Sequence, residues 1–409
     1  MQVRITSRLR FVSIVLTLLM PFGVDCLAQS APGNPSGTAA QTKAPPQPQP
    51  VTAPALQRLA LLLPLSGKQQ AAGMAIRDGF IAAALQQPAS RRGDIEIFDT
   101  NDKGVLDAYS RALQNGANMI VGPLLKEDVE ALAKSRLTSV STLALNTLSD
   151  QQLSTSFMLQ FALDPEEEAR QVAQRAIAED HHRAIMLVPA NEWGQRMQRA
   201  FAEELKASGD SIVDSRSYDP NSTDLVALVK PLFASRKPQP ARKPDDPPAA
   251  RNAIPESRDD FDFVFMAAQP AQARQVYPAI RFVLSDASIP VYATSDSYAT
   301  DSKSRDIDAL RVADMPWVIN RDSDTANLYA QMERAWGAAL RSRSRLYAFG
   351  IDAYKLCDWL NTAQPQLAAP LHGTTGLLTL DSSGRIHRQL DWAQIINGTP
   401  QPLPGLNNN

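Results

Sequence analysis

The sequence is poor in the residues that staple small folds and build catalytic centres. Its 409 residues include 2 cysteines, Cys26 and Cys357, and 4 histidines. Cys26 lies in the N-terminal leader, so cleavage of the leader beyond it would leave Cys357 alone and exclude an intramolecular disulfide. The fold must then be held together by its hydrophobic core, for which an apolar content of 44% provides ample material.

An excess of charge of one sign is also missing. The formal net charge is −2, with 41 Lys and Arg residues against 43 Asp and Glu residues. This balance gives no electrostatic reason to expect nucleic acid or an anionic membrane surface as a partner. The composition is that of an ordinary soluble globular protein, and the length suggests roughly two or three domains.

Motifs that carry enzyme chemistry are absent from the sequence. It has no Gly-x-Ser-x-Gly elbow, no His-Glu-x-x-His pair and no Walker loop. His181 and His182 are adjacent, so their side chains should point apart and make a poor metal site, and His372 and His387 are isolated. Cys357 lies on an apolar helical face, where a buried and unreactive thiol is expected. The sequence therefore predicts a protein that is not an enzyme and holds no metal or cofactor.

The N-terminus has the pattern of an exported protein. Three arginines precede an apolar run over residues 11–22, which is short for a membrane span and typical of a secretory signal peptide. Cleavage after Ala28 would make residues 1–28 the signal peptide and place the mature protein in the periplasm. The alternative is lipidation of Cys26, which would tether the protein to the outer membrane, but Asp25 stands where a lipobox needs a small residue. A membrane is expected as a partner only if Cys26 is acylated.

Two segments of the chain are rich in proline. Residues 29–55 combine proline with Ala, Gln, Thr and Ser, and they should form an extended, solvated linker. Residues 235–257 contain proline among mixed charges and interrupt a regular pattern, which indicates a disordered insertion in a surface loop. The folded domain should therefore run over residues 56–398, with the insertion inside it, and residues 399–409 should form a tail.

Short apolar strands alternate with helices along this domain. One block covers residues 59–145 and a second covers residues 157–234, and each repeats a strand, a helix and the next strand. Such alternation predicts parallel sheets with right-handed crossovers. Later segments continue the pattern, with strands at 261–267 and 289–293, helices at 327–341 and 348–360, and a hairpin at 376–390. We therefore expect two lobes around a cleft, each with a parallel sheet flanked by helices.

A ligand cleft is expected beyond the carboxyl ends of the strands, where open α/β sheets bind their ligands. The loops at this edge provide the candidate residues Ser66, Gly67, Gly122, Asn146, Asn191, Trp193 and Ser295. Ser66 and Gly67 could instead form a plain turn, because the glycine pattern of a phosphate loop is missing. Asn191 could cap a helix while Trp193 fills the interface between the lobes. The acidic triplet at 166–168 is better explained by the dipole of the helix that it begins than by acid–base chemistry.

Eight short stretches resemble segments of one known family. They are LALLLPLSG at 59–67, AIRDGF at 75–80, VGPL at 121–124, PANEWGQ at 189–195, PVYATS at 290–295, DMPW at 314–317, YAFGIDAY at 347–354 and WAQ at 392–394. Together they resemble the LppC/LpoA-type penicillin-binding protein activators, in the binding-protein-like domain of that family, over residues 59–398. Long members of the family also carry an N-terminal helical-repeat domain, where this chain has only the proline-rich segment, and they are outer-membrane lipoproteins.

The resemblance implies a fold and a function. The fold would be that of a type I periplasmic binding protein. The function would be the regulation of peptidoglycan synthesis, in which the protein docks on a bifunctional penicillin-binding protein and stimulates its transpeptidase activity. A docking surface should expose aromatic residues, for which Trp317, Tyr329 and Trp336 are candidates. The rival hypothesis is a periplasmic solute-binding receptor that closes on a small polar ligand in the cleft.

Overall fold

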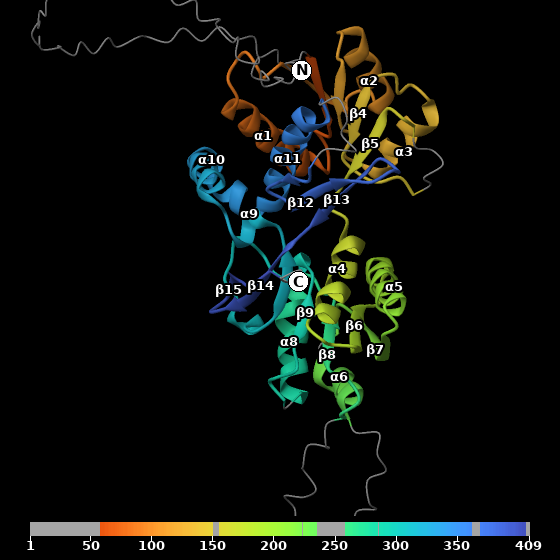
Figure 1. Cartoon of the computed structure of the whole chain (residues 1–409), viewed down its shortest axis with the longest axis vertical. Helices are drawn as coiled ribbons and strands as arrows, with labels where there is room; N and C mark the ends of the chain where they lie inside the picture. The colour runs from red at the N-terminus through yellow and green to blue at the C-terminus, as the bar shows by residue number, and fades with distance from the viewer. Residues whose placement is uncertain are drawn as a thin grey trace, which may run out of the picture.

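The computed structural model describes residues 58–149, 155–222, 224–234, 258–284, 286–361 and 369–405. The predicted signal peptide with Cys26, the linker and the insertion at 235–257 lie outside these ranges. The described chain forms two α/β lobes, one above the other in Figure 1, so the predicted two-lobed architecture is confirmed. No helix in the described part of the chain is both long and apolar enough to cross a membrane.

Within the described residues, the first lobe is built on an eight-stranded sheet in the order β11-β12-β13-β5-β4-β3-β1-β2. Its strands are β1 (Arg58–Leu63), β2 (Asp94–Asp99), β3 (Met119–Val121), β4 (Ser141–Ala144), β5 (Met158–Phe161), β11 (Leu371–His372), β12 (Leu377–Leu380) and β13 (Arg385–Gln389). The strands from β13 to β2 are parallel, whereas β12 pairs antiparallel with both β13 and β11. The predicted hairpin is present as β12 and β13, and its second strand extends the parallel sheet beside β5.

Helices cover both faces of this sheet. They are α1 (Gln70–Gln86), α2 (Val105–Gln114), α3 (Lys126–Ser135), α10 (Ser323–Ser342) and α11 (Ser344–Leu360). In β1, Leu59, Leu61 and Leu63 pack into the core with α1 and α11. Ala60 and Leu62 face the other way and pack with α2 and α3. Because successive side chains of a strand point to opposite faces, a strand covered on both sides is apolar throughout, as this one is from Leu59 to Leu63.

Two glycines let α1 and α11 approach closely. A Cβ atom on Gly79 would lie 2.1 Å from the carbonyl oxygen of Tyr347, and one on Gly350 would lie 2.0 Å from that of Ile76. Any side chain at either position would therefore collide with the backbone of the facing helix. This contact holds the late helix α11 against the first helix of the lobe.

Within the described residues, the second lobe is built on a seven-stranded sheet in the order β15-β14-β10-β9-β8-β6-β7. Its strands are β6 (Arg183–Pro189), β7 (Ser211–Tyr218), β8 (Phe263–Met266), β9 (Val291–Ala293), β10 (Arg311–Asp314), β14 (Asp391–Ile396) and β15 (Thr399–Pro402). One face is covered by α4 (Pro165–Ala178) and α5 (Glu192–Ala207), and the other by α6 (Leu225–Phe233) and α8 (Pro270–Val283).

The described chain passes between the lobes at three places. It crosses from β5 to α4, from β10 through α9 (Pro316–Ile319) to α10, and from β13 to β14. In the last crossing a single residue, Leu390, separates the two strands. Figure 1 shows these connections at the waist of the molecule, between the two lobes.

Three details of the sequence prediction are corrected. Both sheets are mixed rather than purely parallel, because late strands pair antiparallel at one edge of each. The predicted tail at 399–409 begins with β15, which pairs with β14, so the folded domain extends to Pro402. The sequence pattern missed β10 and α9, because β10 holds only two apolar residues between two charged ones and α9 is about one turn long.

Candidate functional site

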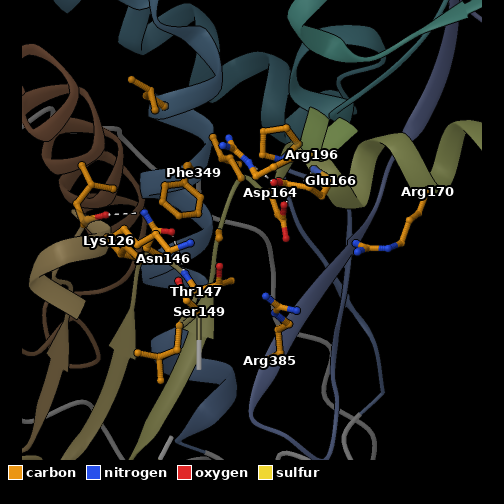
Figure 2. A pocket seen from close by; sticks show the side chains of 17 residues that line it. Lys126, Asn146, Thr147, Ser149, Asp164, Glu166, Arg170, Arg196, Phe349 and Arg385 are labelled. Carbon is orange, nitrogen blue, oxygen red and sulfur yellow. Dashed lines mark hydrogen bonds and ion pairs between the residues drawn. The ribbon is translucent and has the colours of Figure 1, made fainter. Parts of the chain in front are cut away.

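A pocket of about 630 Å³ lies between the two lobes. Its lining residues are Leu124, Lys126, Leu145, Asn146, Thr147, Leu148, Ser149, Ala162, Leu163, Asp164, Pro165, Glu166, Arg170, Arg196, Leu346, Phe349 and Arg385. Figure 2 shows these side chains approaching the pocket from both lobes. Its volume falls in the range of small-molecule sites in proteins.

The wall on the side of the first lobe forms where parallel strands end. Asn146, Thr147 and Ser149 follow β4, and Lys126 is the first residue of α3, which follows β3. The side-chain amide of Asn146 donates to the carbonyl oxygen of Leu124 at 3.0 Å and ties the two loops together. The carboxyl ends of neighbouring strands thus bring polar side chains to one edge, as the rule for open sheets predicts.

The wall on the side of the second lobe is the first turn of α4. Asp164 caps this helix, because its carboxylate accepts from the Glu166 N–H at 3.0 Å, and Pro165 occupies the first helical position. Glu166 forms an ion pair with Arg196 of α5. Burial raises the pKa of Glu166, and Asp164 acts in the same direction. Arg170 follows on the next turn of α4.

The acidic triplet at 166–168 makes specific contacts besides complementing the helix dipole. Glu168 is buried, its Oε1 lies 3.4 Å from Arg388 Nη2, and its Oε2 accepts from the Ser295 N–H at 3.1 Å. Burial raises the pKa of Glu168 to about 7, although Arg388 opposes this. Because Arg388 belongs to β13, this buried pair joins the second lobe to the first.

His387 of β13 forms a second contact between the lobes. Its Nδ1 lies 2.8 Å from Glu167 Oε1, and its Nε2 lies 2.8 Å from Asp381 Oδ2. The hydrogen bond to Glu167, supported by that to Asp381, raises the pKa of His387 to about 9. Burial opposes ionisation of Asp381, but the hydrogen bond from His387 lowers its pKa to about 2. Because both of its ring nitrogens are engaged by carboxylates, His387 has a structural role and holds β13 against α4.

A third contact between the lobes is a pair of charges that connects β10 to α11. Arg345 Nη2 lies 2.7 Å from Asp314 Oδ2, and Arg345 Nε lies 3.1 Å from both oxygens of that carboxylate. The Tyr298 hydroxyl donates to the same carboxylate. Burial alone would lower the pKa of Arg345, but Asp314 raises it. Each of these pairs joins an element of one lobe to an element of the other, and removing one partner would leave a charge at the junction without its counter-ion.

Of the seven residues predicted for the cleft, Asn146 lines this pocket and the other six do not. Ser66 and Gly67 form the turn before α1: the Ser66 carbonyl oxygen accepts from the Asn101 side chain at 2.6 Å, and Gly67 has a φ of +71°. Gly122 is buried, and a Cβ atom there would lie 2.1 Å from a backbone carbonyl oxygen of β1. These positions are explained by chain packing.

The candidates in the second lobe also have structural partners. Asn191 caps α5 by accepting from the Gly194 N–H at 2.8 Å, which is the alternative that the sequence allowed. Trp193 lies in the first turn of α5, is partly buried and packs against the core of the second lobe. Ser295 is buried and donates its N–H to Glu168. That these residues contact a ligand stays a prediction.

The cysteine and the adjacent histidines have ordinary surroundings. Cys357 is buried, and burial raises the pKa of its thiol, as expected of an unreactive cysteine. His182 lies between Asp180 and Asp210, at 3.1 and 2.9 Å. Among the described residues, no group of three or more His, Cys, Asp or Glu side chains is placed to hold a metal ion.

The aromatic residues predicted for a partner surface pack inward. Trp317 is fully buried, and its Nε1–H donates to Ser344 Oγ at 2.9 Å, so its assignment to an exposed surface is wrong. Tyr329 and Trp336 are partly buried against the same core. The sequence shows that a residue is aromatic, whereas its exposure depends on elements that are distant in the sequence.

Sequence reasoning missed the cations of the pocket. Lys126, Arg170, Arg196 and Arg385 all line it. Each stands in a pattern that is normal for a solvated face of a helix or strand, so the sequence carries no signal that separates it from other surface charges. Their proximity is a consequence of the way in which the two lobes meet.

Comparison with known proteins places this architecture in a family. Residues 44–398 match the family model described as "LppC putative lipoprotein". The penicillin-binding protein activator LpoA of Photobacterium profundum is 29% identical over 349 residues, which cover 83% of this chain and 56% of that protein. The chain thus spans a little over half the length of the curated relatives that it matches.

Solved structures share the fold. The C-domain of LpoA (YraM) from Haemophilus influenzae, a regulator of PBP1A, has a TM-score of 0.67 at 23% identity, and the match covers 85% of this chain and 100% of that one. An ABC-transporter solute-binding protein from R. palustris, in complex with benzoate, has a TM-score of 0.52 at 14% identity, covering 86% of this chain and 96% of that one. These likenesses confirm the predicted periplasmic-binding-protein fold. Because the family match covers most of the sequence, the chain belongs to the LppC lipoprotein family.

Proposed function

We propose that this protein is a non-catalytic regulator of peptidoglycan synthesis that docks on a bifunctional penicillin-binding protein and stimulates its transpeptidase activity. The observation that carries the proposal is the match to the entire C-domain of Haemophilus LpoA, a regulator of PBP1A. Relatives from Photobacterium and Vibrio are named penicillin-binding protein activators. Because these relatives are longer than this chain, the proposal assigns the regulatory contact to the two-lobed domain.

The chemistry of the waist supports a regulator over an enzyme. Glu168 pairs with Arg388 and Asp314 pairs with Arg345, and each pair joins the two lobes. A general acid or base must exchange its proton with a substrate, and a nucleophile needs an adjacent base to activate it. The buried groups at this junction are committed to structural pairs instead.

Docking can be tested with purified proteins. The mature chain, starting at Gln29, is passed over an immobilised bifunctional penicillin-binding protein, and a monofunctional transpeptidase serves as the matched control. We expect saturable binding to the first and none to the second. Equal binding to both surfaces, or to neither, would contradict the docking part of the proposal.

Stimulation needs a separate measurement. The synthase is given its lipid-linked precursor with and without the protein, and crosslinked and uncrosslinked peptides are quantified after digestion of the product. We expect a larger crosslinked fraction at an unchanged amount of polymerised glycan. If the protein binds saturably and the crosslinked fraction does not change, the assignment to the transpeptidase step is wrong.

Location is part of the same proposal. We infer export to the periplasm, where the mature protein begins either at Gln29 or at an acylated Cys26 that tethers it to the outer membrane. The description of the family as lipoproteins favours acylation, whereas Asp25 favours cleavage after Ala28. The mass of the mature N-terminal peptide, isolated from cell envelopes, separates the two. A Cys26→Ser variant should leave the membrane fraction only if Cys26 carries the anchor.

The rival function, a solute-binding receptor, is favoured by the pocket between the lobes. The likeness to the benzoate-bound protein, at 14% identity, bears on the fold alone. Ligand binding and docking do not exclude each other, because a ligand that bridges the lobes could bias the docking surface. Binding by this pocket can therefore be examined on its own.

A further inference from the structure

The interlobe pocket holds cations that the protein leaves without acidic partners. Among the described residues, Lys126, Arg170 and Arg385 line the pocket and none of the three forms a salt bridge, whereas the fourth cation, Arg196, pairs with Glu166. The Nε atom of Arg385 is also buried without a hydrogen-bond acceptor in the described part of the chain. A buried donor without an acceptor is costly, so it marks a position where a bound molecule would supply the missing contact.

The two carboxylates of the pocket are already engaged. Asp164 accepts from the first turn of α4, and Glu166 is held by Arg196. The lining therefore has four cationic side chains against two carboxylates, and the excess positive charge faces the pocket. In Figure 2 the side chains of Arg170 and Arg385 both extend toward the middle of the pocket, below Asp164 and Glu166.

The unpaired cations come from both lobes. Lys126 and Arg385 belong to α3 and β13 of the first lobe, whereas Arg170 belongs to α4 of the second. Arg170 and Arg385 also line an adjoining hollow of about 470 Å³, so they stand between two accessible spaces. An anion held between them would link the lobes, and its binding would favour the arrangement in which the lobes are close.

The other residues of the lining indicate what the rest of the ligand should be, besides its anionic group. Apolar side chains such as Leu148, Leu346 and Phe349 share the pocket with Asn146, Thr147 and Ser149. Small-molecule sites typically combine an apolar wall with a few polar groups that fix orientation. A purely polar anion, such as inorganic phosphate, would leave the apolar part of this lining without contacts.

We propose that the interlobe pocket binds a small molecule with one carboxylate or phosphate group on a partly apolar body, and that Arg385 and Arg170 hold the anionic group from opposite lobes. Lys126 adds charge from the third side, and Asn146 and Thr147 offer hydrogen bonds to the body. The proposal goes beyond the regulatory function, and it concerns the isolated protein without any synthase.

Isothermal titration of the mature chain tests the charge requirement. The probes are N-acetylphenylalanine, its neutral amide and phenyl phosphate, which keep the apolar body and change only the anionic group. We expect the carboxylate or the phosphate to bind at least about tenfold more tightly than the amide, which corresponds to about 1.4 kcal/mol. The difference should shrink at high ionic strength, because salt screens the attraction. The ratio of the two anions shows which group the site prefers.

Variants locate the site. Arg385→Gln and Arg170→Gln should each lower the affinity for the anionic probe by about tenfold or more. Arg385→Lys should lower it less than Arg385→Gln. The matched control is Arg199→Gln on α5, whose side chain is exposed and makes no salt bridge in the described part of the chain; it should bind like the wild type. Thermal melting of each variant, without probe, shows that it is folded.

Three results would contradict the proposal. Equal affinity for the acid and its amide would show that binding does not need an anionic group. Unchanged affinity in both Arg385→Gln and Arg170→Gln would show that the probe does not bind in this pocket. If neither anionic probe gives binding heat up to about 10 mM, the proposed ligand class is wrong, because a Kd of roughly 1 mM already represents weak binding.

Discussion

Replacing Asp352 by alanine should destabilise the protein strongly, because this one carboxylate holds the loop between β11 and β12. Asp352 lies on α11 and is fully buried. Its Oδ1 accepts from the Thr374 N–H at 2.7 Å and from the Thr374 hydroxyl at 2.8 Å. Its Oδ2 accepts from the Thr375 N–H at 2.7 Å and from the Thr375 hydroxyl at 2.6 Å. The next strand, β12, thus starts from a loop that is fixed to a helix.

The expected loss of free energy of unfolding follows from the hydrogen-bond donors that the substitution would leave without an acceptor. Two backbone N–H groups would lose the carboxylate oxygens that accept from them, and each buried donor left without an acceptor costs about 1–3 kcal/mol. The two hydroxyls add less, because a hydroxyl can rotate toward another acceptor; Thr374 Oγ1 already lies 2.9 Å from the Ala348 carbonyl oxygen. We therefore expect Asp352→Ala to lower the free energy of unfolding by about 3–5 kcal/mol, which is large for a single substitution.

Urea unfolding, followed by tryptophan fluorescence, provides the measurement, with the midpoints compared at equal slope. The control is Asp358→Ala on the same helix. Its half-exposed side chain lies 3.8 Å from Arg91, and such exposed pairs contribute at most about 1 kcal/mol. A loss below about 1 kcal/mol for Asp352→Ala, or equal losses for the two variants, would refute the reasoning.

Other contacts described above give predictions of the same kind. Gly79→Ala should cost about 1–3 kcal/mol, because its Cβ would meet a carbonyl oxygen of α11 at 2.1 Å; a melting temperature equal to that of the wild type would contradict the close helix contact. Glu168→Ala should cost about 3–5 kcal/mol, because Arg388 would stay buried without its carboxylate, and an unchanged urea midpoint would show that the pair is not needed. Because the pKa of His387 is raised from 6.5 to about 9 in the folded protein, its stabilising effect should be complete below pH 6.5 and disappear as the pH rises through 9. Melting curves of wild type and His387→Gln should therefore converge at high pH, and a constant separation would contradict this.

The sequence predicts the parts of this fold that are encoded locally. Helix α2 (Val105–Gln114) is an example, because its apolar residues recur at helical spacing over its whole length. The start of α4 follows equally well from Asp164 as cap and Pro165 at the first position. Asn146 could be selected for the pocket because the ends of parallel strands share one edge.

The parts that could not be predicted depend on residues distant in the chain. Glu168 and Arg388 are separated by 220 positions, and no local pattern links them. The same holds for Arg170 and Arg385, which line one pocket because β13 lies beside β5 and so comes close to α4. Trp317 shows the same limit, since the sequence does not reveal that this aromatic residue is fully buried rather than exposed for a partner.

The last crossing of the chain also sets the order in which the protein can be finished. A polypeptide leaves the ribosome or a translocation pore from its N-terminus, so β5 and β10 emerge long before the strands that cover them. In the first sheet β5 lacks its partner until β13 is made, and in the second sheet β10 lacks its partner until β14 is made. Until then both lobes carry open strand edges, which invite pairing with other chains. Neither lobe can mature alone, and a nascent chain that stalls before residue 385 would leave two incomplete sheets rather than one finished lobe.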